Sequence, residues 1–398
     1  MELTSKNPRK KNIDRTEGYW IYDETGNRQL DLNCGAFAYT LGYGNQEIID
    51  SMSQSLSTVT RAHLPLGQTT PDIENMKDLL LSTGDMGGLI WALSGSGAVE
   101  AAIHIGQIYM KMIGTPRNRV MVFGNGWHGT TSVTKKYSGL WPLDPSDHTV
   151  SIPTPVWTTL EERDEQETEV INLIREKLDH ATDIGMILIN PNPWFNGLNI
   201  WSKNFWSELD TIRNDYGILI ITDDVASCWG KAKDYHSFKQ LMPEGMSPDI
   251  TCVGKAITAG YAPLSAAVAS KKISDTVQGK VTYSHTFQPY IGGIAAMKAT
   301  NDIIQRDNLF SKTDWIEERL LDIGKILHEG GQATAYKVFG TCATYHLSDS
   351  TIGKNLKGLY YGLSSDMSKI PNFRVCVPLI ADEEYFHHLQ QILLKGLV

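Results

Sequence analysis

The stretch that decides the fold is residues 88–97, which read GLIWALSGSG. A short apolar run ends in a turn made of serine and glycine. Beyond the turn, apolar side chains recur at spacings of three and four, at Ala98, Ala101, Ala102, Ile105, Ile108, Tyr109 and Met112. This spacing is typical of one buried face of a helix. The stretch therefore predicts a buried strand, a tight turn and a helix.

The same alternation continues through the middle of the chain. Short apolar runs predict strands at residues 120–123, 186–189, 218–221 and 250–253. A helical pattern through Phe205, Leu209 and Ile212 separates two of them. Continuous apolar strands that alternate with helices indicate a mostly parallel sheet covered by helices on both faces. The predicted fold class is α/β.

The two ends of the chain differ from the middle. Residues 16–45 carry hairpin signals, and the last hundred residues mix helical and strand patterns. We expect a smaller α+β lobe built from both termini. The predicted division is an N-terminal part of this lobe at 1–55, a large domain at 56–299, and the C-terminal part of the lobe at 300–398.

Composition limits the class of protein. The chain has 398 residues, of which 41% are hydrophobic and 20% charged, and this excludes disordered, collagen-like and coiled-coil chains. The net charge of −9 leaves no large basic surface, so we expect no nucleic-acid partner. The short basic group of Lys6, Arg9, Lys10 and Lys11 is expected to be a solvated arm.

The cysteines and histidines predict neither a disulfide framework nor a metal site. The five cysteines are widely spaced without a Cys-x-x-Cys pair, and the histidines, including His285 and the pair His387–His388, lack metal-ligand spacing. The beginning of the chain lacks the apolar core of a signal peptide, and no apolar run approaches 18 residues. We expect a soluble, cytoplasmic protein without a membrane segment.

Residues with distinctive chemistry follow the predicted strands, where ligands of open α/β sheets bind. Lys255 lies in an apolar setting that would lower the pKa of an amine, as Schiff-base formation requires, although most lysines are merely exposed. Asp223 ends a strand, where it is either a helix cap or a partner for a protonated ring nitrogen.

The residues after two further predicted strands also allow both a structural and a functional interpretation. The turn at 94–97 could bind phosphate at a helix N-terminus or be only a tight turn. Trp127 offers either a stacking plane for a cofactor ring or a core aromatic at the sheet edge. Binding of pyridoxal phosphate requires a phosphate turn, an aromatic ring, an acidic group and a lysine. The sequence contains all four, one after another along the chain.

Motifs along nearly the whole chain resemble the class III aminotransferases, which are pyridoxal-phosphate enzymes of fold type I. The similar segments are GYWIYDETGNRQLDLNCGAFAYTLGYGNQEI, SGSGAVEAA, GWHG, LIITDDV, DITCVGKAITAGYAPLSAAVAS, SHTF and FRVCVPLI. The resemblance implies pyridoxal 5'-phosphate as the cofactor and a homodimer with shared active sites. It also implies an amine donor and a carbonyl acceptor as the small-molecule substrates.

The resemblance also implies roles for individual residues. Lys255 would form the Schiff base with the cofactor and move the proton, while Asp223 would pair with the ring nitrogen. The other cofactor-binding residues would be Gly95, Ser96, Trp127, His128, Val225 and, from the partner subunit, Thr286. Arg374 would receive a substrate carboxylate, with Trp127 and Phe37 also at the substrate.

Within the family, the motifs are most similar to the diaminopelargonate synthase branch. The chain departs from that branch at Ala36-Phe37, Trp127, Thr130, Asn190 and Phe195. The last of these stands where members that use two kinds of substrate keep a gating glutamate. The alternatives are an aminomutase of the glutamate-1-semialdehyde type, a racemase or a decarboxylase, or an inactive binding protein on the same scaffold.

Overall fold

A seven-stranded sheet organises the larger part of the structure, a computed structural model that describes residues 12–139, 149–194, 197–348 and 372–395. The strand order is β4 (Gly88–Ala92), β10 (Ser265–Ala269), β9 (Ile250–Val253), β8 (Leu219–Asp223), β7 (Ile184–Ile189), β5 (Arg119–Phe123) and β6 (Thr149–Ile152). The five strands from β9 to β6 are parallel, and β10 runs antiparallel to both of its neighbours. This confirms the predicted α/β class with a mostly parallel sheet.

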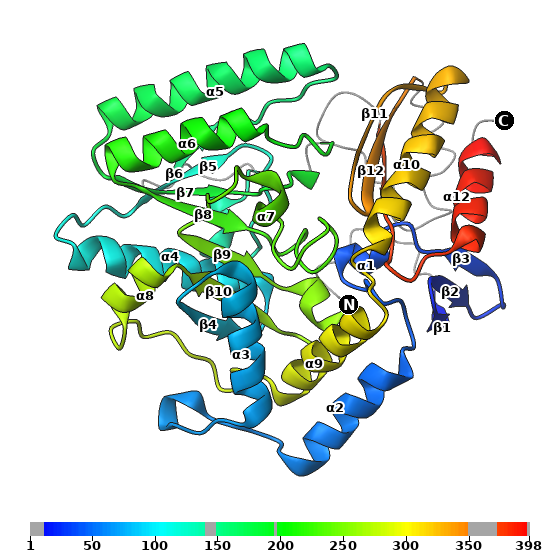
Figure 1. Cartoon of the computed structure of the whole chain (residues 1–398), viewed down its shortest axis with the longest axis horizontal. Coiled ribbons are helices and arrows are strands. Elements are labelled where there is room, and N and C mark those ends of the chain that lie inside the picture. The colour runs from blue at the N-terminus through cyan, green and yellow to red at the C-terminus, as the bar shows by residue number, and fades with distance from the viewer. Residues whose placement is uncertain (1–11, 140–148, 195–196, 349–371, 396–398) are drawn as a thin grey trace.

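Helices cover both faces of this sheet (Figure 1). On one face, α4 (Gly95–Met112) and α8 (Lys271–Val277) pack over the apolar residues of the strands. The other face is covered by α5 (Leu160–His180) and α6 (Lys203–Tyr216) near β7, and by α2 (Gln46–Thr58), α3 (Pro71–Gly84) and α9 (Ile291–Arg306) near β10. The strands are buried on both sides, which explains their continuous apolar sequences.

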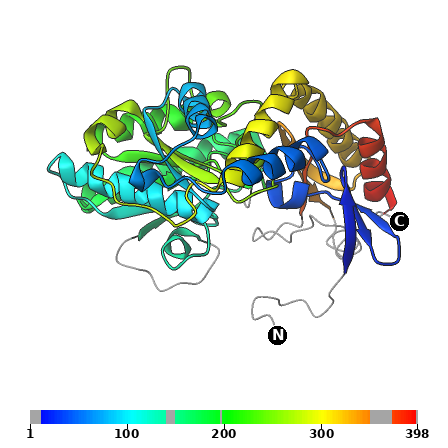
Figure 2. The same ribbon diagram turned by 90° about the horizontal axis from the view of Figure 1, so that it is seen from below.

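The smaller lobe joins segments from both ends of the chain. It contains two three-stranded antiparallel sheets, β1 (Ile13–Glu17), β2 (Trp20–Asp23) and β3 (Arg28–Leu30), and β11 (Ala333–Phe339), β12 (Cys342–Leu347) and β13 (Asn372–Cys376). Among the described residues, its helices are α10 (Lys312–Glu329) and α12 (Glu383–Lys395). One apolar core includes Leu30 and Leu32 together with Leu320, Tyr345 and Leu389. Figure 2 accordingly shows the first strands beside the last helix.

The other elements in the described part of the chain are short: α1 (Cys34–Phe37), α7 (Phe238–Leu241), and the 3₁₀ turns η1 (Leu64–Leu66), η2 (Thr134–Tyr137) and η4 (Lys255–Thr258). The expected domain boundaries at residues 55 and 299 fall inside α2 and α9, which pack on each other, so that division stays a prediction. Within the described residues, no helix has the length and apolar character needed to cross a bilayer. The basic residues at 6–11 and Phe195 lie outside the described residues.

Two local features were not predicted from the sequence. Strand β10 has the small-residue sequence Ser-Ala-Ala-Val-Ala and inserts antiparallel between β4 and β9. Residues 34–37 form a left-handed turn, with φ of 49° at Cys34, 62° at Ala36 and 69° at Phe37. Left-handed backbone is costly for residues with a side chain. The Asp31 carboxylate holds the turn by accepting hydrogen bonds from the Gly35 amide at 2.6 Å and the Tyr43 hydroxyl at 2.8 Å.

Candidate active site

A cavity of about 200 Å³ lies at the carboxyl ends of the sheet strands. Its walls come from the segments that follow β4, β5, β7, β8 and β9. The lining residues are Ser94, Gly95, Ser96, Trp127, His128, Gly129, Asn190, Asn192, Trp194, Asp223, Val225, Ala226 and Lys255. Parallel strands bring their carboxyl ends to one edge, and this explains how residues 160 positions apart meet.

Lys255 directly follows β9 and opens η4 with a positive φ of 48°. It faces the cavity and keeps partial contact with solvent, although protein surrounds the side chain. Burial lowers the pKa of the Lys255 amine to about 8, and the nearby Asp223 carboxylate opposes that shift. The amine lies 5.2 Å from the centroid of the Phe37 ring. Lys255 is thus an amine with an unusually large neutral fraction near neutral pH.

Asp223 is the last residue of β8 and is buried at the cavity. One carboxylate oxygen, Oδ2, lies 2.8 Å from Nδ1 of His128, whose ring is buried as well. The other, Oδ1, accepts from the Val225 amide at 3.3 Å. A carboxylate fixed from two directions offers a stable negative charge to a cationic group in the cavity.

The N-terminus of α4 forms another wall. The Ser94 side chain caps the helix by accepting from the Gly97 amide at 3.1 Å. Ser96 presents its hydroxyl beside Gly129, where an added Cβ would collide with the Ser96 Oγ. A Cβ on Gly95 would lie 2.9 Å from Cγ1 of Val225. Helix dipole, backbone N–H groups and closely approaching glycines together suit an anion such as phosphate.

Trp127 and Val225 enter the cavity from different strand ends, after β5 and β8. Asn190, which follows β7, donates from Nδ2 to the carbonyl of Asp223 at 3.3 Å and to that of Trp127 at 3.5 Å. This amide therefore links the two segments that carry the acidic and aromatic groups.

The sequence reasoning did not assign Asn190, Asn192, Trp194 or Ala226 to the site. The first three follow strand β7, so their place after a predicted strand was the available signal. Their orientation toward the cavity depends on the turn after β7, which periodicity does not describe.

Three other predicted residues lie outside the cavity lining. Phe37 packs edge-on against Trp194, with ring centroids 4.5 Å apart, and so lies directly behind the wall. Arg374 on β13 is buried and donates from Nη1 to the Trp194 carbonyl at 2.7 Å. Thr286 is exposed, in the segment between β10 and α9, and does not line the cavity of its own chain.

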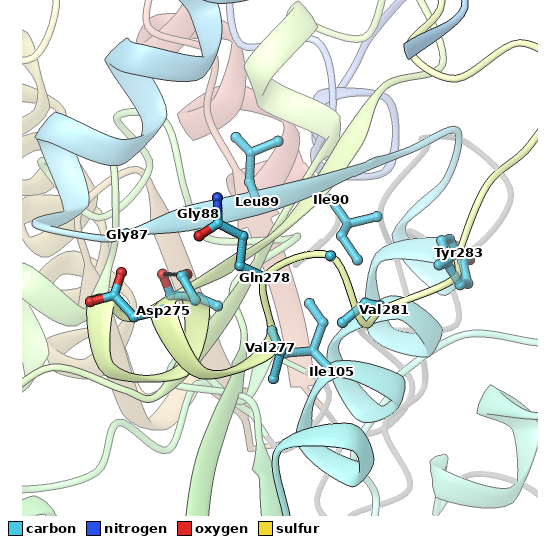
Figure 3. A pocket seen from close by; sticks show the side chains of 13 residues that line it. Gly87, Gly88, Leu89, Ile90, Ile105, Asp275, Val277, Gln278, Val281 and Tyr283 are labelled. Atoms are coloured by element: carbon cyan, nitrogen blue, oxygen red, sulfur yellow. Dashed lines mark hydrogen bonds between the residues drawn. The ribbon is translucent and has the colours of Figure 1, made fainter. Parts of the chain in front are cut away.

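A larger cavity of about 410 Å³ lies at the other end of β4, beside α8 (Figure 3). Ile105 of α4 and Val277 of α8 lie side by side there, and Asp275 contributes the carboxylate. Its lining includes no lysine, cysteine or histidine. Of these two cavities, the one at Lys255 brings an amine, an imidazole and a carboxylate together.

Comparison with known proteins identifies the family of the chain. The family model for class-III aminotransferases matches residues 4–342. An uncharacterized aminotransferase of Schizosaccharomyces pombe is 26% identical over 82% of this chain and 73% of its own length. The adenosylmethionine-8-amino-7-oxononanoate aminotransferase of Staphylococcus aureus is also 26% identical, over 66% of this chain and 60% of its own length. The alanine/serine racemase of Pyrococcus horikoshii is 25% identical over 77% and 67%.

Solved structures share the fold at lower sequence identity. An omega transaminase from Pseudomonas jessenii in complex with PMP superimposes with a TM-score of 0.87, at 19% identity over 98% of this chain and 92% of that one. An amine transaminase from an uncultivated Pseudomonas species, in its PLP-bound form, gives 0.88 at 20% identity over 100% and 97%. The fold is thus that of fold-type I transaminases, and the chain belongs to the class-III aminotransferase family.

Proposed function

We propose that the protein is a pyridoxal-phosphate-dependent transaminase. It moves an amino group from an amine or amino-acid donor to a ketone or aldehyde acceptor. The observation that carries this proposal is the meeting of Lys255, Asp223 and the α4 N-terminus at one cavity. Class-III aminotransferases use pyridoxal phosphate, and the two solved relatives hold PMP and PLP.

The residues present fit this cofactor in chemistry and in shape. The anionic end would be held by Gly95 and Ser96, where glycines 95 and 129 leave no room for a Cβ. The ring would lie between Trp127 and Val225, and its nitrogen would face the doubly fixed Asp223 carboxylate. His128 would act on the cofactor through Asp223, because it orients that carboxylate.

When bound, the cofactor supplies an electron sink for the bond broken at the amine-bearing carbon. The Asp223 carboxylate would favour a protonated ring nitrogen, and Lys255, with its lowered pKa, would hold the cofactor and accept or donate the proton at its amine. The Phe37 and Trp194 rings pack together, and the Phe37 ring lies 5.2 Å from the Lys255 amine, so these rings would shield the cofactor from water.

The predicted binder of a substrate carboxylate, Arg374, already makes a hydrogen bond within the protein. Arg374 and Phe37 are proposed as substrate residues together with Trp127. Arg374 already donates to the Trp194 carbonyl, so a substrate carboxylate would have to share or replace that hydrogen bond. A diaminopelargonate-synthase-like activity is a finer version of this proposal, and the 26% identical staphylococcal relative supports it.

We also propose a homodimer in which Thr286 reaches the phosphate of the partner's site. The loop that carries it is anchored on both sides, because the Tyr283 hydroxyl donates to the Gly97 carbonyl at 2.8 Å and Gln288 donates to the Trp91 carbonyl. Between these anchors, Thr286 is exposed and Phe287 is 63% exposed. The cytoplasmic location remains a prediction, compatible with five cysteines that are all free.

The test is the visible spectrum of the purified protein with pyridoxal phosphate, followed while single amines are added. Candidates are S-adenosylmethionine, lysine, glutamate, alanine and simple diamines. We expect a visible band that one donor bleaches, and stoichiometric consumption of a carbonyl acceptor. Lys255→Ala should show neither the band nor turnover, whereas Lys233→Ala, at a partly exposed ion pair, should behave as wild type.

Other results of this experiment would distinguish the alternative functions. A racemase interconverts enantiomers and an aminomutase shifts the amino group within one molecule, and neither consumes an external acceptor. A decarboxylase releases carbon dioxide. Unchanged turnover in Lys255→Ala would contradict the site assignment, and the absence of a band in the wild-type protein would leave an inactive binding scaffold.

A further inference from the structure

Three of the five cysteines converge behind the cavity wall. Cys34 comes from the left-handed turn α1, Cys342 from the start of β12 and Cys376 from the end of β13. All three are at most 2% exposed, and they share one apolar cluster with Phe37 and Trp194. Cys376 pairs with Cys342 across the two strands and shares this cluster with Cys34.

Cys342 and Cys376 are direct cross-strand partners. The Cys376 amide donates to the carbonyl of Leu32 at 2.9 Å and so does not bond to Cys342. The Val377 amide donates to the carbonyl of Thr341, on β12's side of the pair, at 2.9 Å. Cys342 and Cys376 therefore form a non-hydrogen-bonded pair, the position at which antiparallel Cα atoms approach to about 4.5 Å. A disulfide requires a Cα separation of roughly 4.4–6.8 Å. The two thiols can therefore be joined without moving either strand.

A buried lysine lies next to the start of β12, where Cys342 is found. Lys231 is 1% exposed, and its carbonyl accepts from the Thr341 amide at 3.0 Å, which fixes it beside Cys342. In the part of the chain that the structure describes, its Nζ has no hydrogen-bond partner. Its charge acts on Cys34, Cys342 and Cys376. A buried ammonium requires a compensating negative charge, and a thiolate at the centre of this cluster supplies one.

The influences on the pKa of Cys376 agree with a thiolate that is paired with the Lys231 ammonium. Burial alone would raise the pKa of its thiol. The hydrogen bonds from Cys34 and Cys342 and the Lys231 charge outweigh burial and hold the pKa of Cys376 well below its usual value. Burial raises the pKa of Cys34 and Cys342, which stay protonated. Among the described residues no group of three ligands suits a metal ion, so the cluster points to thiol oxidation.

We propose that Cys342 and Cys376 form a peroxide-sensitive dithiol, with Lys231 as the cation that stabilises the reactive sulfur. The Cys376 thiolate attacks hydrogen peroxide, so that an S–O bond forms, the O–O bond breaks and one water leaves after protonation. The Cys342 thiol then attacks that sulfur, the S–O bond breaks and a second water leaves. Two thiols lose two electrons and two protons, and the peroxide is reduced to two waters.

The test begins with the full-length wild-type protein, reduced, freed of reductant and exposed to increasing hydrogen peroxide. Peptides are mapped by mass spectrometry without reduction. We expect a linkage between the peptides of Cys342 and Cys376 that dithiothreitol reverses. Cys252, equally buried but in another core cluster, is the internal control and should stay a thiol. Oxidation of Cys252 at the same rate, or of Cys376 without this linkage, would overturn the proposal.

A pair of lysine variants tests the role of the cation. Lys231→Met keeps the length of the side chain and removes its charge, so we expect Cys376 to oxidise about tenfold more slowly. Lys233→Met, two residues away at an ion pair with Asp314 and Glu317, should oxidise at the wild-type rate. Equal rates in the two variants would exclude Lys231 from the site. The wild-type comparison of Cys376 with Cys252 needs no variant and decides the matter if Lys231→Met does not fold.

Discussion

Two features of the structure act on the pKa of Lys255 in opposite directions. Burial disfavours the charged ammonium and lowers the pKa to about 8, while the Asp223 carboxylate acts in the other direction. Only the neutral amine attacks a carbonyl carbon. At pH 7, a lysine with this pKa has on the order of a hundredfold more neutral amine than an ordinary lysine.

This gives a pH dependence with a defined sign. Below about pH 8 the rate of cofactor attachment should rise about tenfold per pH unit, because deprotonation of Lys255 creates the nucleophile. Above that pH the rate should level off. Rapid mixing of the cofactor-free protein with pyridoxal phosphate at a series of pH values measures it. A rate that keeps rising to the pKa of an ordinary lysine would show that the amine is not shifted.

His128 is expected to matter through Asp223. The His128→Phe variant keeps a ring in the buried position but removes the group that lies 2.8 Å from the Asp223 carboxylate. Loss of a hydrogen bond to a charged group costs about 1.5–3 kcal/mol, so kcat/KM should fall about 10- to 100-fold. His180→Phe, at the exposed end of α5, is the control. Equal activities in the two variants would contradict a positioning role.

Among single residues, Lys255, Asp223 and Trp127 were singled out because each follows a predicted strand, and all three line the cavity. The catalytic roles of Lys255 and Asp223 and the binding role of Trp127 remain predictions. The meeting of Cys34, Cys342 and Cys376 was not predictable, since more than 300 positions separate the first thiol from the other two in sequence. Such a meeting depends on how the smaller lobe packs, and hydrophobic periodicity reports only which face of an element is buried.

At the scale of elements, the N-terminus of α4 links helix stability to anion binding. Ser94 caps this helix, and Thr159 caps α5 as part of a capping box far from the cavity. Replacing either cap by Ala should lower the free energy of unfolding by about 1 kcal/mol. Only Ser94→Ala should also weaken binding of pyridoxal phosphate, measured by titration. Equal weakening by Thr159→Ala would mean that the loss is one of general stability.

The elements also show where sequence patterns succeed and where they fail. Strands β5, β7, β8 and β9 were predicted from apolar runs because both of their faces are buried. Strand β10 was missed because its alanine-rich sequence lacks the β-branched and aromatic residues that mark strands. The left-handed turn α1 was missed because it depends on the Asp31 carboxylate, which accepts from the amides of Asn33, just before the turn, and of Gly35 within it.

At the scale of the molecule, the two lobes meet at charged as well as apolar contacts. Lys337 of β11 is buried and donates to the carbonyl of Trp157 and to Asn199, both in segments that flank the large sheet. Its ammonium also lies 3.8 Å from the centroid of the Trp157 ring. The cluster that contains Cys342 and Phe37 reaches the cavity through Trp194, which belongs to the cluster and to the cavity lining. The smaller lobe thus supports the cavity wall from behind, through the contacts that Phe37 and Arg374 make with Trp194.

The proposed shared site predicts complementation between two defective chains. Lys255→Ala removes the nucleophile of its own chain, and Thr286→Asp places a negative charge where the partner's phosphate would bind. Each homodimer should be inactive or weakly active. In the heterodimer, one site combines an intact Lys255 with an intact Thr286 from the other chain.

Heterodimers isolated with two different affinity tags should therefore recover about half of the wild-type activity per dimer, through the one intact site. Pairing Lys255→Ala with Asp223→Asn supplies the control. There the second chain lacks a residue of its own cavity, so both sites of the heterodimer stay defective. Recovery in the first pairing and not in the second requires Thr286 to act across the subunit boundary. An active Thr286→Asp homodimer, or no recovery in the first pairing, would show that each chain completes its site alone.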